Sequence, residues 1–394
     1  MPRLENLRLE EILVSDECRD DEMRPFSLFD QCRAAIQKIS KFPPPVALAL
    51  QSTPQSYFVD HGVGHLIRAQ EYADELVDKA NIPMNCGEAL LLLLSIWSHD
   101  VAMLFKLNAQ ESDKYARDNH HERVVDVLAR LQQSGSFPPL PFALGSVVIA
   151  ITRAHRRLVD ISLVRELSRT GSHDIRVRLL AAILRIADAS DIDQRRAPEA
   201  VFEIYESGIP QESKVYWHKH AMVAGIRYDT LSASVWINIL PPAESVRNVV
   251  NHLELLHWLK QELEHELESV RGIFREYRVP LFHVQLFDHS SGERLELERP
   301  PRTVPYFLIR ILQVNLASNA LDQLETTLKK YPGNHKVAIE IVTSSGARLF
   351  GTVPNLCVEH NDAVADATRA TLGDALAGFQ FQSIPSEDIR QVSK

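Results

Sequence analysis

The sequence predicts a mainly α-helical protein, a helical bundle with a small β-strand extension that is followed by a C-terminal α/β module. Between residues 57 and 198, apolar residues recur at spacings of three and four, the pattern of helices with one buried face. After residue 198, short runs rich in β-branched and aromatic residues indicate strands. From residue 305 onward, patterns typical of helices and of strands alternate, which predicts a separate α/β unit.

The chain has 394 residues, which is too long for one hydrophobic core, and we expect three parts. Residues 1–55 are expected to form a helical N-terminal extension that ends in the helix-breaking stretch KFPPP. Residues 56–287 are expected to hold the bundle, its strand-containing extension and a long amphipathic helix. Residues 305–394 are expected to form the small C-terminal module.

Individual stretches of the sequence predict where the helices and strands lie. LLLLLSIW and RLLAAILRIA are apolar almost all round, so both should be central helices of the bundle. VFEIYES, VAGIRYDT and ASVWINIL should contain strands, and residues 246–277 should form the long helix. In the C-terminal module we expect a helix at NALDQLETTLKKY, a turn at Pro332-Gly333, two strands and a closing helix around DAVADATRATLG.

Bulk properties point to a soluble cytoplasmic protein that does not enter a membrane. The net charge of −9 disfavours a general nucleic-acid coat protein, although a basic pocket can lie on an acidic surface. The apolar run at residues 89–97 falls short of the ~20 residues of a membrane span, and the N-terminus lacks the layout of a signal peptide. Four widely separated cysteines argue against a zinc ribbon or disulfide scaffold and fit a reducing cytoplasm: Cys18, Cys32, Cys86 and Cys357.

Residues that commonly bind metals stand at or near the ends of the apolar helices. They are His61, His65, His99, Asp100, His120, His121, Glu122, His155, Asp188 and Asp191. If these helix ends meet at one end of the bundle, their side chains can surround a cation. Imidazole and carboxylate ligands together suit Mn, Fe, Ni, Co or Zn, with Mg less suited where histidine dominates. Such an ion lowers the pKa of water and polarises a phosphoryl oxygen, as phosphoester hydrolysis requires.

The motif order resembles a known superfamily. His65, His99-Asp100 and Asp188, within HLIRA, LLSIWSHDVA and ILRIADASD, resemble the H…HD…D signature of the HD-domain metal-dependent phosphohydrolases. The resemblance implies that these four residues bind a divalent metal. Asp191 is either a carboxylate that supports a ligand or a residue of the turn that ends its helix. Ala102 departs from the glycine that often follows the HD pair. DHGVGH and WHKH also look like the HD-CE subgroup, which is similar to proteins of bacterial conflict systems.

Two readings of the neighbouring histidines stay open. DNHHERVV resembles a helix start of the deoxynucleoside triphosphate triphosphohydrolases, which implies that His121 transfers a proton and Glu122 fixes its tautomer, unless His120 takes that place. HD phosphodiesterases hold a second metal with two further histidines, and His121 and His155 follow in that order. In a one-metal site, His155 would contact phosphate instead. This stretch also reads simply as a capped helix N-terminus.

A polyphosphate substrate requires positive charge beyond that of a metal ion, and Arg side chains match phosphate oxygens well. The candidate substrate or phosphate contacts are His61, His155, Arg153, Arg156, Arg195 and Lys219. Further basic residues, Arg157 and Arg196, lie beside them. Any of these could equally belong to a solvated helix end.

The resemblances imply a nucleotide hydrolase that converts deoxynucleoside triphosphates to deoxynucleoside and triphosphate by metal-activated water. The alternatives are a two-metal phosphodiesterase of a cyclic or dinucleotide signal and a nucleotide sensor without turnover. A homo-oligomer, a regulatory nucleotide or partner protein, and a role in antiviral defence are expected by the same likeness. The C-terminal segment is similar to the tail module of bacterial DNA polymerase III alpha subunits, which implies an accessory or binding unit; it could equally pack an oligomer.

Overall fold

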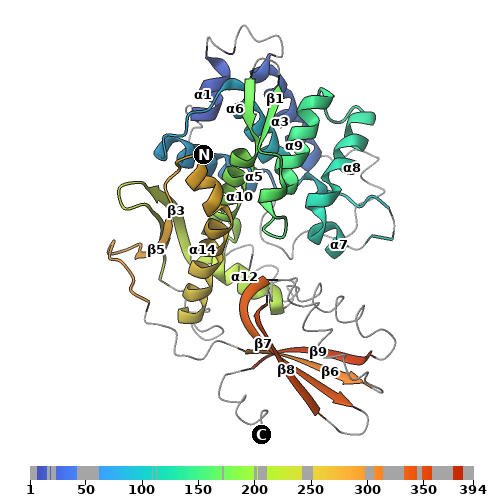
Figure 1. Cartoon of the computed structure of the whole chain (residues 1–394), viewed down its shortest axis with the longest axis vertical. Coiled ribbons are helices and arrows are strands. Elements are labelled where there is room, and N and C mark those ends of the chain that lie inside the picture. The colour runs from blue at the N-terminus through green and yellow to red at the C-terminus, as the bar shows by residue number, and fades with distance from the viewer. Residues whose placement is uncertain are drawn as a thin grey trace. The chain divides into compact units, whose positions relative to one another are not determined.

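The computed structural model describes residues 7–15, 18, 24–41, 62–108, 110–111, 113–170, 173–198, 202, 211–241 and 252–297, together with four strands nearer the C-terminus. The chain divides into two compact units, Met1–Glu296 and Leu297–Lys394. Helices dominate the first unit and strands β6 to β9 form the sheet of the second (Figure 1). The predicted mainly α-helical class with small β elements is confirmed.

Helix α6 is the centre of the first unit. It runs over Cys86–Ser98, and every one of its residues is buried, as the apolar run LLLLLSIW predicts. Asn85 and Glu88 form a capping box that starts the helix. Helices on several sides pack against α6. These neighbours are α1 (Arg8–Val14), α3 (Pro25–Lys41), α5 (Val63–Lys79), α9 (Phe142–Arg153) and α10 (Val177–Ala189).

The N-terminal helices are also tied to α6 covalently. Cys18 and Cys86, 68 residues apart in sequence, form a disulfide with a Cα–Cα distance of 5.8 Å. The expectation of unpaired cysteines is therefore wrong for this pair, because the packing of the N-terminal segment on α6 brings together thiols that sequence spacing keeps apart. Cys32 is buried and free.

A short hairpin precedes α10 and does not follow from the sequence patterns, which predict helices between residues 57 and 198. Strands β1 (Leu167–Thr170) and β2 (His173–Arg176) pair antiparallel, with Thr170 opposite His173. Arg176 at its end donates hydrogen bonds to Glu88, one of them 2.7 Å long. The hairpin thus fixes the start of α10 against the start of α6.

The predicted strands in VAGIRYDT and ASVWINIL are β3 and β4, and they form a three-stranded sheet of order β3-β4-β5 with a third strand that was not predicted. Strands β3 and β4 are antiparallel, whereas β4 and β5 are parallel because the long helix α14 connects them. Helix α14 packs on α10 and so attaches the sheet to the bundle. The bounds are α12 Gln211–Ala221, β3 Val223–Asp229, β4 Ser234–Ile239, α14 His252–Glu276 and β5 His283–Asp288.

The second unit contains a four-stranded sheet of order β8-β7-β6-β9, in which the central pair β6 and β7 is parallel. Its strands are β6 (Tyr306–Gln313), β7 (Pro332–Thr343), β8 (Arg348–Leu356) and β9 (Leu376–Ile384). Strands β7 and β8 match the two predicted strands, but the predicted turn at Pro332-Gly333 is the irregular first part of β7. The two helices predicted for the C-terminal module lie outside the described residues. So does the predicted strand VFEIYES, except for Phe202.

Among the described residues, Cys86–Leu104 is the stretch long and apolar enough to cross a membrane, with a mean hydropathy of 1.3. It consists of α6 and the short 3₁₀ helix η2 (Val101–Leu104), and 89% of its apolar window is buried inside the protein. That burial is what a core helix of a bundle requires.

Asp74, a buried residue of α5, caps helix α1 through a hydrogen bond of 2.8 Å from the Leu9 N–H to its Oδ1. Burial, assisted by the charges of Glu10 and Glu11 and opposed by the Leu9 hydrogen bond, raises the pKa of Asp74 to about 7. The folded protein therefore binds one more proton here than the unfolded chain between about pH 4 and pH 7. Its free energy of unfolding falls as the pH rises through this window.

The Asp74→Asn variant keeps an acceptor for the Leu9 N–H and removes the titrating group. We expect it to be more stable than the wild type at about pH 8, by on the order of 1.4 kcal/mol per unit of pKa shift, with the difference vanishing near pH 4. Urea denaturation followed by circular dichroism measures this difference. Asp78→Asn, at a more exposed position of α5, is the control, and a pH-independent difference for Asp74→Asn would contradict the assignment.

Candidate metal centre

Four buried histidines and two aspartates converge where the bundle helices end. His65 lies in the first turn of α5, and His99-Asp100 directly follows α6. His120 is the first residue of α8 (His120–Gln133), and His155 lies two residues beyond α9. Asp188 is in the last turn of α10. The apolar bodies of these helices form the wall behind the cluster.

Four of these residues form the first cluster. The Nε2 of His65 lies 3.1 Å from the Nε2 of His99, 3.4 Å from Oδ2 of Asp100 and 3.2 Å from Oδ1 of Asp188. The Nε2 of His99 lies 3.5 Å from the same Asp100 oxygen and 3.6 Å from the same Asp188 oxygen. Ligands about 2.1 Å from a tetrahedral ion are separated by roughly 3.4 Å. The spacing therefore suits one divalent cation.

A second cluster uses the other oxygen of Asp100. Its Oδ1 lies 3.1 Å from Nε2 of His120 and 4.0 Å from Nε2 of His155, and the two imidazole nitrogens are 3.0 Å apart. Both groups, His65 with His99 and Asp100, and Asp100 with His120 and His155, are placed to hold a metal ion. Asp100 is common to both, so its carboxylate can bridge two ions.

The second ring nitrogen of each histidine is engaged in a hydrogen bond. His99, His120 and His155 each place Nδ1 against the carbonyl oxygen of the residue three positions earlier, at 2.7 Å in the case of His99. A carbonyl only accepts hydrogen bonds, so Nδ1 carries the hydrogen and Nε2 keeps its lone pair. All three side chains are therefore held in the tautomer that binds a metal through Nε2.

In His65 the acceptor for Nδ1 is a carboxylate, Oδ2 of Asp191, at 2.6 Å. Arg68 donates to both oxygens of Asp191, at 2.6 and 3.2 Å, and Arg196 donates to its main-chain carbonyl at 2.8 Å. These contacts hold Asp191 behind His65, the supporting position that the sequence suggests. A carboxylate behind a ligating histidine orients the ring and increases its basicity.

Protons compete with metal at this cluster. Burial and the charge of Arg196 lower the pKa of His65, but its hydrogen bonds with Asp188 and Asp191 outweigh them and raise it to about 9. By contrast, burial and the neighbouring His120 and His99 hold the pKa of His155 well below its usual value. A metal must displace the proton on His65, so binding at the first cluster strengthens as the pH rises.

Two buried arginines hold the chain segments that present the histidines, and sequence patterns did not identify them. Arg123 donates to the carbonyls of Ala102 and Phe105, at 2.7 and 2.6 Å, and so fixes the segment after Asp100. Arg185 donates to carbonyls on either side of His155, those of Ala154 (2.6 Å), Arg156 (3.0 Å) and Val159 (2.7 Å). For Arg185, the available signal was a charge enclosed by apolar residues within a helix, in AAILRIA.

The structure brings His120 rather than His121 to Asp100. His121 is buried, and its Nε2 is 4.0 Å from Oε1 of Glu122, too far for the hydrogen bond by which Glu122 would fix its tautomer. Glu122 is instead half-exposed and paired with Arg153. Consecutive residues at a helix start point about 100° apart, so only one of the two histidines faces the cluster.

Other predicted phosphate contacts have acidic partners elsewhere. Arg195 is paired with Asp193, whose Oδ2 is 2.5 Å from its Nη2, and lies near Glu71. Lys219 is buried, paired with Glu262, with its Nζ 4.5 Å from the ring centre of Trp258. The two contacts of Lys219 hold helix α12 on α14.

Two predicted contacts remain. Arg156 directly follows His155, is half-buried, and forms no ion pair with any residue that the structure describes. His61 lies outside the described residues.

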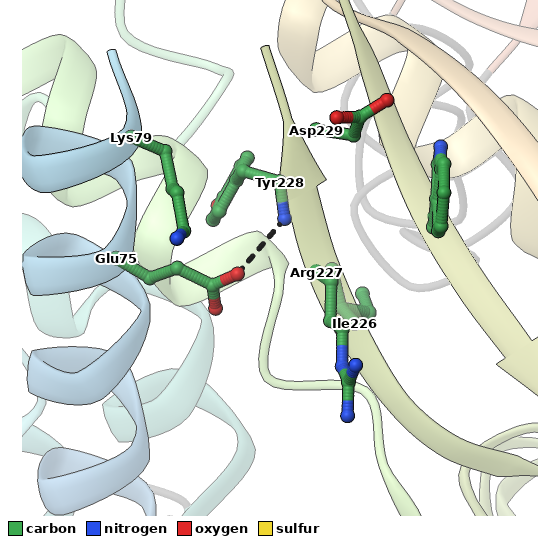
Figure 2. A pocket seen from close by; sticks show the side chains of 7 residues that line it. Glu75, Lys79, Ile226, Arg227, Tyr228 and Asp229 are labelled. Atoms are coloured by element: carbon green, nitrogen blue, oxygen red, sulfur yellow. Dashed lines mark hydrogen bonds between the residues drawn. The ribbon is translucent and has the colours of Figure 1, made fainter. Parts of the chain in front are cut away.

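A pocket of about 440 Å³ lies away from the histidines, between α5 and strands β3 and β4. Figure 2 shows the Tyr228 N–H directed at Glu75, a hydrogen bond of 3.0 Å, with Lys79 and Arg227 on either side of this pair. No cluster residue lines the pocket. One residue links the pocket to the centre. Tyr228 lines the pocket, and its hydroxyl shares a 2.7 Å hydrogen bond with Ser190, in the turn between Asp188 and Asp191.

Comparison with known families adds one finding. The family model HD-CE matches residues 55–269, more than half of the chain, a range that includes every residue of both clusters. No curated protein and no solved structure matches the chain.

The shared carboxylate predicts a distinctive metal stoichiometry. We expect about two Mn²⁺ per chain at saturation in the wild type and about one in His155→Ala, because only the second cluster loses a ligand. Asp100→Ala removes a ligand from both clusters and should retain almost none. Elemental analysis after removal of free metal gives the counts, with His283→Ala on an exposed histidine of β5 as control. A count of one that His155→Ala leaves unchanged would contradict two clusters.

The hydrogen bond between His65 and Asp191 predicts that metal affinity depends on a residue that is not itself a ligand. Asp191→Asn keeps an acceptor for the ring N–H but removes the negative charge, and we expect metal affinity to fall roughly 10–100-fold. Titration of metal-stripped protein against a chelating dye measures the affinity, and Asp126→Asn on the exposed side of α8 is the control. Equal affinities for the two variants would show that Asp191 does not support the metal site.

Proposed function

Because the chain belongs to the HD-CE family, we propose that it is a metal-dependent phosphohydrolase whose two ligand clusters, with Asp100 common to both, would hold divalent cations. The observation that carries this proposal is the pair of ligand clusters that share this carboxylate. Four imidazoles with two carboxylates favour Mn, Fe, Co, Ni or Zn over Ca and Mg. Two such ions, when bound, activate water and offset the charge of a phosphoryl group.

The residues around the ions have distinct tasks in this proposal. His65, His99 and Asp188 would hold the first cation, and His120 and His155 would hold the second. The Asp188 side chain is 25% exposed, whereas those of His65 and His99 are fully buried, so substrate approaches from the side of Asp188. The low pKa of His155 keeps its ring neutral at physiological pH, the form that binds a metal.

We propose a nucleotide phosphoester as the substrate, and two classes follow from different observations. The sequence likeness favours deoxynucleoside triphosphates. The second cluster, built from His120 and His155, favours hydrolysis of a cyclic or dinucleotide phosphodiester, since a two-ion site stabilises both the attacking and the leaving oxygen. The likeness to conflict-system proteins supports a further proposal, nucleotide depletion in antiviral defence by a cytoplasmic homo-oligomer.

An unbiased depletion assay tests this function. The full-length protein with Mn²⁺ is incubated with deoxynucleoside triphosphates, ribonucleotides and cyclic and dinucleotides, and products are identified by mass spectrometry. We expect one class to be consumed and turnover to fall by on the order of a thousandfold or more in His99→Ala/Asp100→Ala, with His283→Ala unaffected.

The products identify the reaction. Deoxynucleoside with triphosphate indicates a triphosphohydrolase, and linear mononucleotides formed from a cyclic or dinucleotide indicate a phosphodiesterase. If metal-loaded protein consumes none of these compounds while one of them raises its melting temperature, the protein is a sensor and the proposed hydrolysis is wrong.

A further inference from the structure

Arg185 is a charged side chain inside the apolar core helix α10. Only 2% of its surface is exposed, and every residue of the range Leu179–Ala187 around it is buried as well. Taking a guanidinium group out of water costs free energy unless its N–H groups find acceptors. Its hydrogen bonds to the described residues all go to neutral oxygen atoms. An apolar residue would avoid this cost, so these hydrogen bonds are what an arginine adds at this position.

Most of the hydrogen bonds of Arg185 converge on the turn that carries His155. Its Nε and Nη2 donate to the carbonyl of Ala154, at 3.0 and 2.6 Å. Nη2 also donates to the carbonyls of Arg156, at 3.0 Å, and Val159, at 2.7 Å. The backbone is thereby held immediately before and immediately after His155.

The place of His155 decides whether the second cluster forms. The hydrogen bond from its Nδ1 to the Thr152 carbonyl fixes the direction of the ring but not the backbone that carries it. Its Nε2 lies 3.0 Å from Nε2 of His120 and 4.0 Å from Oδ1 of Asp100. Metal–ligand distances tolerate only about 0.2 Å, so a shift of roughly 1 Å in the turn would remove His155 from the ligand set.

The first cluster does not depend on this turn. His65 lies in α5 and His99 directly follows α6, and Arg185 makes no hydrogen bond to either of these segments as far as the structure describes them. Asp188 shares α10 with Arg185, but the apolar side chains of that helix pack it in the core. Loss of the guanidinium group should therefore affect the second cluster and spare the first.

The remaining hydrogen bond of Arg185 leads to helix α14. Its Nη1 donates to the Ser269 hydroxyl at 3.0 Å, and that hydroxyl donates in turn to the Glu266 carbonyl at 2.7 Å. Arg157, in the same turn as His155, places its Nη1 3.8 Å from Oε1 of Glu266. The turn is therefore attached to α14 at two points, and α14 is the helix that connects β4 with β5.

We propose that Arg185 is the positioning residue of the second cation site and that, through Ser269, it makes this site depend on the docking of α14. The inference rests on the proposed two-cation centre. It divides that centre into a first site built into the bundle and a second site that a change at α14 weakens without touching the first. Displacement of α14 would thus release the second cation and leave the first in place.

Metal counts and spectroscopy test the role of Arg185. Arg185→Met keeps a long side chain in the core but removes every donor. We expect about two Mn²⁺ per chain in the wild type and about one in Arg185→Met, with the second cation bound roughly tenfold or more weakly. In electron paramagnetic resonance, the exchange-coupled signal of paired Mn²⁺ should give way to that of an isolated ion. Arg176→Met removes an arginine that ties the start of α10 to α6, and as the control it should keep both cations.

Further measurements separate positioning from a general effect on the fold. Ser269→Ala removes only the acceptor on α14 and should weaken binding of the second cation roughly threefold or more. Arg185→Ala should regain the second cation when guanidinium chloride is added at a non-denaturing concentration, but not with sodium chloride at the same ionic strength. In metal-stripped protein, amide hydrogen exchange at residues 154–159 should be faster in Arg185→Met than in the wild type, a readout that needs no cation.

Several results would overturn the inference. Two cations retained in folded Arg185→Met would do so, as would unchanged hydrogen exchange at residues 154–159. An equal loss of the second cation in Arg176→Met would show that Arg185 acts only through the stability of the fold. Ser269 is half-buried and provides a variant that folds if Arg185→Met does not, and unchanged affinity for the second cation there also contradicts the proposal.

Failure of the proposed function has a different signature. A wild-type count of one cation refutes the two-cation centre, and the role of Arg185 with it. Two cations that depend on Arg185, in a protein that hydrolyses no nucleotide, support the positioning role and refute only the hydrolysis.

Discussion

The centre depends on one repeated interaction, a histidine beside a helix end that donates its Nδ1–H to the carbonyl three residues earlier. The last carbonyls of a helix have no donor within the helix, and leaving them unsatisfied in the interior costs free energy. His99, His120 and His155 each satisfy such a carbonyl, and the same bond turns Nε2 toward the centre. One hydrogen bond thus caps the helix and orients the ligand.

The arrangement holds because buried charges are matched across the bundle. Arg123 and Arg185 satisfy carbonyls in the segments that follow the HD pair and α9, and Arg68 neutralises Asp191 behind His65. Each spans elements far apart in the sequence, so the ligand positions depend on the packing of the entire bundle. The leucine-rich middle of α6 makes this feasible, since Leu90–Leu94 fill the interior with side chains that need no polar partners.

The two clusters share Asp100 and therefore depend on each other, but they differ in the number of carboxylates. The first has two carboxylates in contact and a third, Asp191, behind it, whereas the second has only the shared oxygen of Asp100. Coulomb's law therefore predicts that the first cluster would bind a cation more tightly than the second. A cation there would also partly neutralise Asp100, the only carboxylate in the second cluster, and so weaken binding of a second cation.

The sequence by itself determined the helical class, the apolar core helices and the presence of metal-ligating residues at helix ends, because apolar periodicity and the HD pair are local features. It left His120 and His121 undecided, since neighbouring residues differ by about 100° in direction and only the packing of α8 selects one. It gave no indication of the Cys18–Cys86 disulfide or of the bonds of Arg185. Residues that contact each other in the fold can lie far apart along the chain; His65 and Asp191, for example, are 126 residues apart. Apolar periodicity indicates which face of a helix or strand is buried, but it does not identify the residues that this face contacts.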